Sequence, residues 1–129
     1  MIIQIIKEGE KNFSILVKGM VHADFLAVPI LDLAKVKPPR EGWKGLRLDS
    51  AVWAIQEKLG LYLWWDKPDG EKTLALVMES RNGLRYDEGI LSPRKQDGWN
   101  GILYLSSFNC DSPAKGVKAY SVVLDFDKQ

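Results

Sequence analysis

The sequence predicts an all-β protein, a single antiparallel β-sandwich of about eight or nine strands. Three observations lead to this fold class. Hydrophobic residues recur with a period of two along most of the chain, which is typical of strands with one buried face. The apolar runs are short, and each is bounded by Gly, Pro, Asn, Asp or Ser. Almost no segment keeps the helical period of about 3.6 residues.

Length and composition indicate one globular domain over residues 1–129. The chain has 129 residues, of which 46% are hydrophobic and 27% charged, so it is too apolar for a disordered protein. The formal net charge is +1, which disfavours binding to nucleic acid or to an anionic membrane through phosphate contacts. The single cysteine, Cys110, excludes an internal disulfide and a thiolate metal cluster.

The N-terminal stretch MIIQIIKEGEKN is a poor signal peptide. It is apolar for only a few residues and has neither a basic leader nor a cleavage site of small residues. No apolar run approaches the roughly 20 residues that a membrane-spanning helix needs. We therefore expect synthesis in the cytoplasm and no association with a membrane.

Nine apolar runs are the expected strands. They are residues 2–6, 13–20, 25–33, 46–55, 61–65, 74–78, 84–86, 102–107 and 119–126. The last run alternates most clearly, because every second residue from 120 to 126 is apolar while Ser121 and Asp125 lie between them. Pro29 cannot donate to a strand ladder, so the third run is predicted to be an edge strand or to be broken there. The stretch KVKPPREGWKG is the longest early connection.

The run LRLDSAVWAI changes its alternation in the middle. Leu48 and the leucine before it share one parity, whereas Ala51 and the apolar residues after it share the other. A β-bulge at Asp49 and Ser50 would return both sets to the core face. A helix over residues 49–59 is the alternative, since apolar residues there also fit a helical period, but the β-branched and aromatic side chains favour the strand.

The stretch LYLWWDKPDGEKTLAL predicts a hairpin whose first strand is apolar on both faces. Alternation places Leu61, Leu63 and Trp65 on one face, and Tyr62 and Trp64 on the other. Pro and Gly in DKPDGE favour the turn between the strands. Because only one face can line the core of a sandwich, Tyr62 and Trp64 are candidate interface residues.

Residue types that carry catalysis are sparse. His22 is the only histidine, so no histidine pair can hold zinc, and a Ser-His-Asp triad could form only around this residue. Cys110 has no neighbouring histidine to activate its thiol. No glycine-rich loop of the kind that cradles phosphates is present. We therefore expect no catalytic residue, no metal and no cofactor.

The acidic residues allow two weaker interpretations, a calcium site and a pair of catalytic carboxylates. Asp66, Asp69 and Glu71 lie within one turn but lack the spacing of an EF-hand, so a solvated turn is the simpler interpretation. Neighbouring carboxylates, as in the segments 125–127 and 87–88, could serve a glycosidase only if the fold held them about 5–9 Å apart across a cleft. Asp125 and Asp127, and Asp87 and Glu88, are the two pairs.

Two tryptophans lie in loops flanked by glycine, Trp43 in REGWKG and Trp99 in DGWNG. An exposed indole there could stack on a sugar or insert into a partner protein. The alternative is a ring folded back as a lid on the end of the sandwich. Trp43 and Trp99 thus join Tyr62 and Trp64 as candidate interface residues, with both interpretations open.

Seven stretches follow one another in an order that resembles a known family. They are IIKEGEKNFSILVKG, ILDLAKV, LRLDSAVWAI, LYLWWD, NGLRYDEGILSP, GWNGILYLSS and YSVVLDFDK. The family comprises small β-sandwich proteins of tailed bacteriophages, usually described as virion structural proteins. Trp65 and Asp66 match its paired Trp and Asp. Asn100 stands where the family usually has Thr, and Ile102 where it tends to have Asp, so altered turn hydrogen bonds are expected.

The resemblance implies a jelly-roll-like sandwich acting as a structural protein of the virion, without cofactor or catalytic residues. A capsid decoration or cement protein is the first expectation, and a neck or tail component is the second. The partners would be copies of the chain itself, with a trimer as the expected assembly, and a major capsid or neck or tail protein. A carbohydrate-binding β-sandwich module is the alternative, and an enzyme comes third.

Overall fold

The structure, a computed structural model, describes residues 1–66, 72–79, 81–86, 98–110 and 116–129. Within these residues it has nine strands and one short 3-10 helix, η1 (Leu33–Lys35). The strands are β1 (Ile2–Glu8), β2 (Asn12–Val21), β3 (Val28–Asp32), β4 (Leu46–Ile55), β5 (Gly60–Asp66), β6 (Lys72–Met78), β7 (Arg81–Tyr86), β8 (Ile102–Phe108) and β9 (Lys118–Lys128). Each coincides with one of the nine apolar runs, so the all-β prediction is confirmed.

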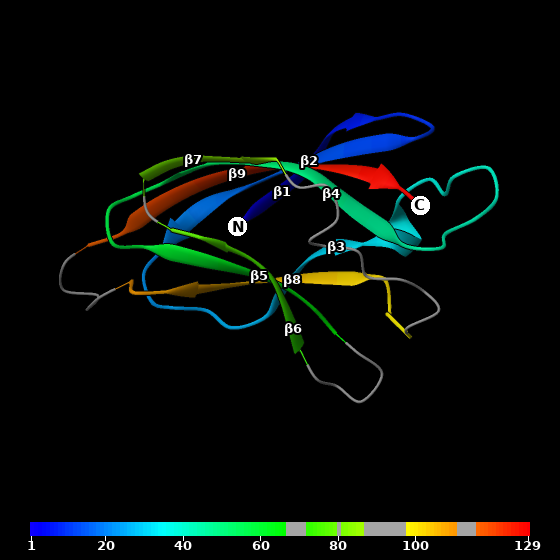
Figure 1. Cartoon of the computed structure of the whole chain (residues 1–129). Coiled ribbons are helices and arrows are strands. Elements are labelled where there is room, and N and C mark those ends of the chain that lie inside the picture. The colour runs from blue at the N-terminus through cyan, green and yellow to red at the C-terminus, as the bar shows by residue number, and fades with distance from the viewer. Residues whose placement is uncertain (67–71, 80, 87–97, 111–115) are drawn as a thin grey trace.

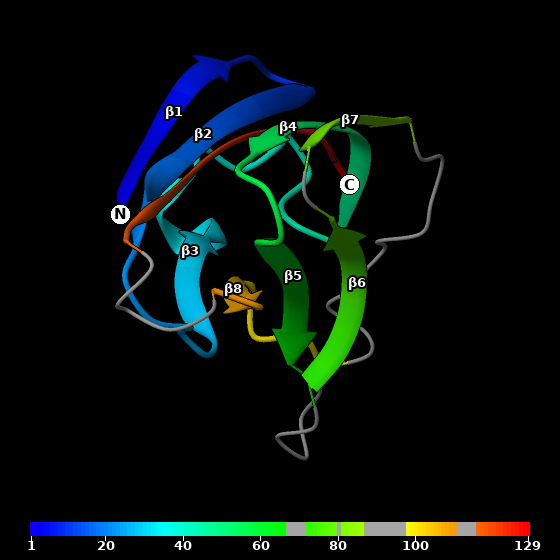
Figure 2. The same cartoon turned by 90° about the vertical axis from the view of Figure 1, so that its left-hand side faces the viewer.

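The strands form two antiparallel sheets that lie face to face (Figure 1). One sheet has five strands in the order β1-β2-β9-β4-β7, and the other has four in the order β3-β8-β5-β6. Figure 2 shows β1, β2, β4 and β7 in the upper layer and β3, β8, β5 and β6 in the lower one. The fold is therefore a β-sandwich.

The strand pairing is nested, as in one long hairpin rolled up on itself. β5 pairs with β6, β4 with β7, β3 with β8, and β2 with β9, all antiparallel. Two further pairings, β4 with β9 and β5 with β8, join these turns of the roll into sheets. This is the topology of an eight-stranded jelly roll. It confirms the predicted fold class and leaves β1 as an additional strand at one edge.

The core lies between the inner faces of the two sheets. The buried side chains of β9 alternate as predicted and are Tyr120, Val122, Leu124 and Phe126. Phe126 stacks on Phe13 of β2, with 5.1 Å between the ring centroids. Burial of each such side chain stabilises the fold by about 1.5–3 kcal/mol. The alternation in the sequence therefore identifies the inner face correctly.

The predicted bulge in β4 is present, and the helical alternative for residues 49–59 is wrong. Against β9, Leu48 pairs with Phe126 and Ser50 with Asp125, so Asp49 is the inserted residue. The insertion restores the parity: apolar residues before and after it lie on the core face, where Ala51 is fully buried. The carboxylate of Asp49 accepts from Arg47 Nε at 2.9 Å. A strand, not a helix, forms because β9 supplies a ladder along the length of β4 and β7 supplies a second one from Ser50 to Ile55.

β3 is an edge strand of the four-stranded sheet, as Pro29 predicts. Pro29 is exposed, and the register against β8 shifts between Pro29 and Leu31. The irregularity accommodates a residue that has no backbone N–H. η1 follows at once, and the carboxylate of Asp32 caps it by accepting from the backbone N–H of Ala34 at 3.0 Å.

β5 has the two apolar faces that its sequence predicts. Leu61 and Leu63 are fully buried on the inner face, and Trp65 packs against the same core while remaining partly exposed. Tyr62 and Trp64 lie on the outer face and are half-buried. One tryptophan of the adjacent pair thus serves the core and the other does not.

Several sequence-based expectations concern residues outside those described. The turn DKPDGE falls there except for Asp66, which ends β5, and with it Asp69 and Glu71 of the acidic cluster. Asp87 and Glu88 lie outside as well.

Candidate functional site

Aromatic side chains form a strip on the outer face of the four-stranded sheet. We define the aromatic strip as Tyr62, Trp64 and Phe108. Tyr62 stacks on Phe108 with 4.3 Å between ring centroids and an interplanar angle of 18°, and Trp64 meets Tyr62 edge-on at 5.4 Å. β5 and β8 are neighbouring strands, so the rings are fixed to a rigid ladder. The first pair is stacked and the second is T-shaped, and T-shaped contact is among the favoured aromatic geometries.

The strip continues as an apolar surface onto β6. Val77 pairs with Tyr62, and Leu74 pairs with Trp64 across a register shift. Leu74 is 45% exposed, which is high for a leucine on a sheet. On the β6 side of the strip the outer face is therefore apolar although the inner face already supplies the core, whereas on β8 Ser106 pairs with Tyr62. Apolar patches of this kind mark interaction sites on soluble proteins.

Trp64 carries an uncompensated polar group. Its indole Nε1 is buried and has no hydrogen-bond partner among the residues that the structure describes. An unpaired buried donor costs about 1–3 kcal/mol, because the group has lost its bond to water. The unpaired donor of Trp64 therefore lowers the free energy of unfolding of the isolated chain.

Trp99 is not available as an interface residue, which corrects the expectation for this loop. Only 7% of its surface is exposed, and its Nε1–H donates to the carbonyl of Ile102 at 3.0 Å. Gly98 and Gly101 have φ of 81° and 84°, in the left-handed region that favours glycine. The flanking glycines thus fold the indole inward, and the lid interpretation holds for Trp99.

Trp43 is half-buried and packs on the end of the core. Its ring meets Phe13 edge-on at 6.4 Å, and Lys128 Nζ lies 5.9 Å from its centroid. Lys128 is itself buried, and its ammonium donates to the carbonyl of Lys37 at 2.7 Å. The loop containing Trp43 is thereby tied to the end of β9. Part of this ring remains exposed, so Trp43 stays a candidate, although it does not share a groove lined by Trp99.

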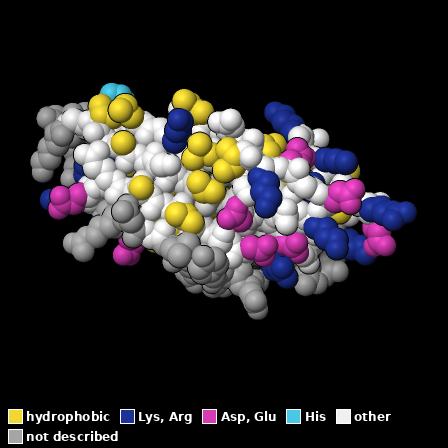
Figure 3. Space-filling model, turned by 90° about the horizontal axis from the view of Figure 1, so that it is seen from above, with side chains coloured by type: hydrophobic (Ala, Val, Ile, Leu, Met, Phe, Trp, Pro, Cys, Tyr) yellow, Lys and Arg dark blue, Asp and Glu magenta, His cyan; other side chains and the backbone are white. Residues whose placement is uncertain are grey.

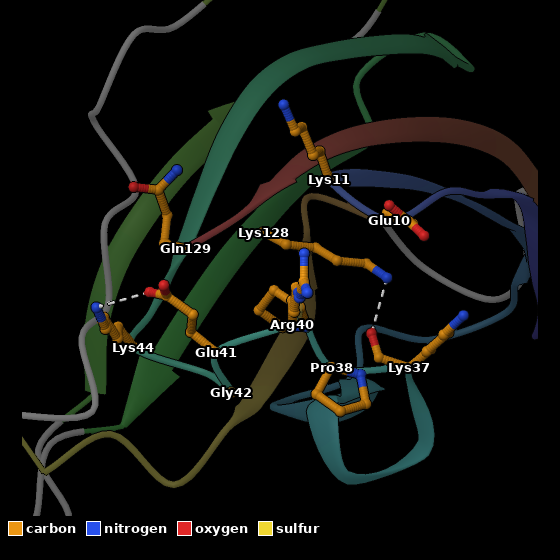
Figure 4. Close-up of a pocket in the computed structure, with 11 residues that line it drawn as sticks. Glu10, Lys11, Lys37, Pro38, Arg40, Glu41, Gly42, Lys44, Lys128 and Gln129 are labelled. Carbon is orange, nitrogen blue, oxygen red and sulfur yellow. Dashed lines mark hydrogen bonds and ion pairs between the residues drawn. The ribbon is translucent and has the colours of Figure 1, made fainter.

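A pocket of about 720 Å³ lies beside this loop (Figure 4). Five basic residues and two acidic residues line it: Lys11, Lys37, Arg40, Lys44, Lys128, Glu10 and Glu41. Glu41 pairs with Lys44 at 3.6 Å, and both side chains are more than 70% exposed, so this ion pair adds little stability. The wall contains no aromatic ring on which a sugar could stack. A small anionic group is the chemistry that such a wall favours.

The local charge of one loop indicates this basic pocket, whereas the net charge of the whole chain does not. The connection of residues 35–44 holds four basic residues and one acidic residue, whereas the whole chain has a net charge of only +1. No local pattern in the sequence predicts that Lys11, at the start of β2, and Lys128, at the end of β9, also line this pocket. The basic wall arises because these segments meet at one end of the sandwich.

β1 is the most exposed strand described. Every one of its residues is exposed, including four isoleucines, of which Ile2 is 56% and Ile3 42% exposed. It pairs with β2 on one side only. Beneath it an apolar groove of about 350 Å³ runs between the sheets, with Ile5 on one wall and Val36 on the other. Sequence reasoning identified this run as a strand but not as an uncovered edge.

The candidate catalytic groups do not converge in the part of the chain that the structure describes. His22 is exposed at the end of β2, and Cys110 is buried with its thiol on the carbonyl of Val21 at 3.4 Å. Asp125 accepts from the hydroxyls of Ser14 and Ser50 and so serves the sheet surface. Asp127 pairs instead with Arg47 at 3.3 Å.

Two kinds of feature are absent from the residues that the structure describes. They contain no group of three or more His, Cys, Asp or Glu side chains placed to hold a metal ion. They also contain no helix with the length and apolar character needed to span a membrane. No protein-family model matches the sequence, and no curated protein matches it.

Proposed function

We propose that this protein is a structural component of a tailed-bacteriophage virion that acts through protein–protein contacts and not as an enzyme. A capsid decoration or cement protein is the first placement, and a neck or tail component is the second. Its partners would be copies of itself and the major capsid or a neck or tail protein. Its location would be the assembled virion.

The observation that carries the proposal is the aromatic strip on the outer face of a sheet. Tyr62, Trp64 and Phe108 are held on two paired strands, so they lose little further freedom when a partner covers them. Rigid aromatic anchors of this type dominate protein interfaces, where a central tryptophan contributes about 2 kcal/mol or more. The strip thus has the composition and rigidity of an adhesive surface.

The fold and the charge agree with this role. Jelly rolls occur in viral capsid domains, although a fold alone does not determine function. A net charge of +1 gives little long-range steering, so association would depend on apolar contact and shape. Binding to a virion surface should therefore depend weakly on ionic strength.

Carbohydrate binding is the second candidate, and the same strip favours it. Lectins also use jelly rolls, and the stacked rings of Tyr62 and Phe108 present a platform on which a sugar could lie. The basic pocket does not support this alternative, because its wall has no aromatic ring. The two candidates differ in whether the strip covers protein or sugar.

The direct test is mass spectrometry of purified particles of the phage that encodes the chain. Peptides of this protein should be recovered in amounts comparable with other structural proteins. Purified Tyr62→Ala protein should rebind to particles depleted of the native protein less well than Leu26→Ala, whose side chain is 80% exposed outside the strip. Absence from particles, together with glycan binding that Tyr62→Ala abolishes, would replace the proposal with the carbohydrate module.

A further inference from the structure

We propose that β1 is a dimerisation strand. Two copies would pair their β1 strands antiparallel about a two-fold axis at Gln4 and join their five-stranded sheets into one continuous sheet. This inference deepens the proposed function, since it rests on the adhesive role and names the surface and the partner. The partner is a second copy of this chain.

The edge formed by β1 carries little of the usual protection against pairing: a register shift against β2, between Ile5 and Lys7, lies near its end. Among the described strands none lies on its outer side, so the backbone groups that point away from β2 have no ladder partner there. No proline interrupts β1, and its charged residues, Lys7 and Glu8, lie only at its end. Natural edge strands are normally blunted by such residues or covered by a loop. An open apolar edge is a template for another strand.

The sequence of this edge is its own mirror. Residues 2–6 read Ile-Ile-Gln-Ile-Ile, which is identical in both directions about Gln4. In an antiparallel pair centred there, Ile2 of one copy lies opposite Ile6 of the second copy, Ile3 opposite Ile5, and Gln4 opposite Gln4. A two-fold interface requires a surface that complements itself. The sequence of this strand meets that requirement from Ile2 to Ile6, and its register shift lies at the far end, between Ile5 and Lys7.

Charge selects the same register. In the pairing centred on Gln4, Lys7 and Glu8 of the two copies fall at opposite ends of the contact, so like charges are kept apart. A slip of two residues toward Glu8 would set Lys7 of the second copy against Ile3. A slip the other way would set Gln4 of one copy against Ile2 of the second copy. The Gln4 register therefore places the most apolar side chains opposite one another.

Both faces of the paired strands would gain cover. Ile3 and Ile5 pair with the buried residues Val17 and Ile15 of β2, and so they lie on the inner side, above the groove beneath β1. In the dimer, each would meet its counterpart from the second copy. The groove at the edge of the sandwich would then be bridged by four isoleucines in place of two.

The outer face would be continuous across the axis. Gln4, Leu16, Val123 and Val52 are successive cross-strand partners from β1 through β2 and β9 to β4. Figure 3 shows hydrophobic side chains over the middle of the upper face, with charged ones gathered toward the end where the C-terminus lies. A two-fold at Gln4 would join this row to its copy, and the charged ends would remain apart.

The expected assembly is a reversible dimer. Two seven-residue strands form a contact in the small class, below about 1,200 Å², which is typical of weak and transient association. Antiparallel pairing of identical edges closes with two copies, whereas a trimer needs contact between two different patches. The trimer expected from the sequence would therefore require another surface.

Cross-linking at the axis tests the register. Only at Gln4 does a residue meet its own copy, with Cα atoms about 4.5 or 5.5 Å apart, which suits a disulfide. Gln4→Cys should oxidise to a covalent dimer, while native Cys110 is 1% exposed and does not compete. The control is Lys18→Cys, on the exposed outer face of β2, which should stay monomeric under the same oxidation.

Charge exchange tests the pairing of Ile3 with Ile5. Ile3→Lys and Ile5→Glu should each weaken the dimer about tenfold or more in analytical ultracentrifugation, since each change acts twice. The double variant should recover most of the affinity, because lysine and glutamate then face each other at both positions. Leu26→Lys is the control away from β1, and circular dichroism verifies that each variant is folded.

The outcomes separate this inference from the proposed function. Concentration-dependent dimers that cross-link through Gln4→Cys would support it. A protein that remains monomeric at high concentration, a trimer, or a dimer that Gln4→Cys does not trap would each overturn it. A monomeric protein found in virions would sink the dimer alone, whereas a dimer absent from virions would sink only the virion role.

Discussion

The ring of Phe108 lies directly across Gly60. The two residues are cross-strand partners on β8 and β5, and a Cβ built on Gly60 would lie 2.0 Å from Phe108 Cζ. Phe108 stacks in turn on Tyr62. Glycine is needed here for close approach to the backbone, and not for an unusual φ. The aromatic strip therefore depends on a missing side chain.

Gly60→Ala should destabilise the protein by about 1–3 kcal/mol, because the methyl group displaces the ring of Phe108. Without this clash, alanine in a strand would be slightly stabilising. Urea denaturation of Gly60→Ala, Phe108→Ala and the double variant measures the coupling. Gly60→Ala should cost much less in the Phe108→Ala background, and equal costs in both backgrounds would show that the ring is not the cause.

Trp64→Phe should leave the free energy of unfolding unchanged or raise it. The substitution removes the buried, unpaired Nε1–H while keeping most of the apolar ring. Trp99→Phe is the matched control, because it removes an Nε1–H that is bonded to the carbonyl of Ile102. That variant should lose about 1 kcal/mol or more. Similar losses in both variants would contradict the assignment of an unpaired donor.

Deletion of Asp49 should be tolerated. It removes the inserted residue, so Ser50 still pairs with Asp125 and Ala51 still faces the core. The lost ion pair with Arg47 is about 40% exposed and contributes little. Deletion of Val52 is the comparison, because it turns Trp53 and Ile55 to the wrong face. Thermal melts should show a folded protein for the first deletion only, and the reverse order would refute the bulge.

Tyr120 should make the protein sensitive to alkali. Burial raises the pKa of its hydroxyl above the ordinary value of about 10, since the phenolate would lose its hydration. Above that pH the unfolded chain releases a proton that the folded chain retains, so stability is complete below pH 10 and falls as the pH rises.

The variant Tyr120→Phe isolates this effect. As the pH rises above about 10, the free energy of unfolding of the native protein should fall more steeply than that of the variant. At pH 7 both side chains are neutral, and the difference there measures packing alone. Parallel curves across the alkaline range would exclude Tyr120 as the titrating group.

Structural features that depend on residues close together in the sequence could be predicted. The alternation of β9, the parity change at Asp49 and the break at Pro29 each reflect the two-residue period of a strand, so their structural outcomes could be predicted. The two faces of β5 followed from the same rule. Local chemistry therefore accounted for the strands and for which side of each faces the core.

Features that depend on distant segments were not legible. The glycines around Trp99 were compatible with a displayed or an inward ring, and only the acceptor at Ile102 and the surrounding core decide between them. The exposure of β1 follows from its place outside the eight-stranded roll, which its own sequence does not encode. Lys128 meets Trp43 only because β9 ends beside that loop.

The nested pairing has a consequence for how the chain folds. β9 is the last strand described, yet it lies between β2 and β4 and supplies four core side chains to their sheet. During synthesis, β2 and β4 cannot pair with β9, the strand that lies between them, until β9 has left the ribosome. Pairings between segments so far apart in sequence form slowly and leave apolar strands open to aggregation. Folding on the ribosome should therefore complete in one late step, and ribosome-bound chains stalled before residue 118 should remain sensitive to protease.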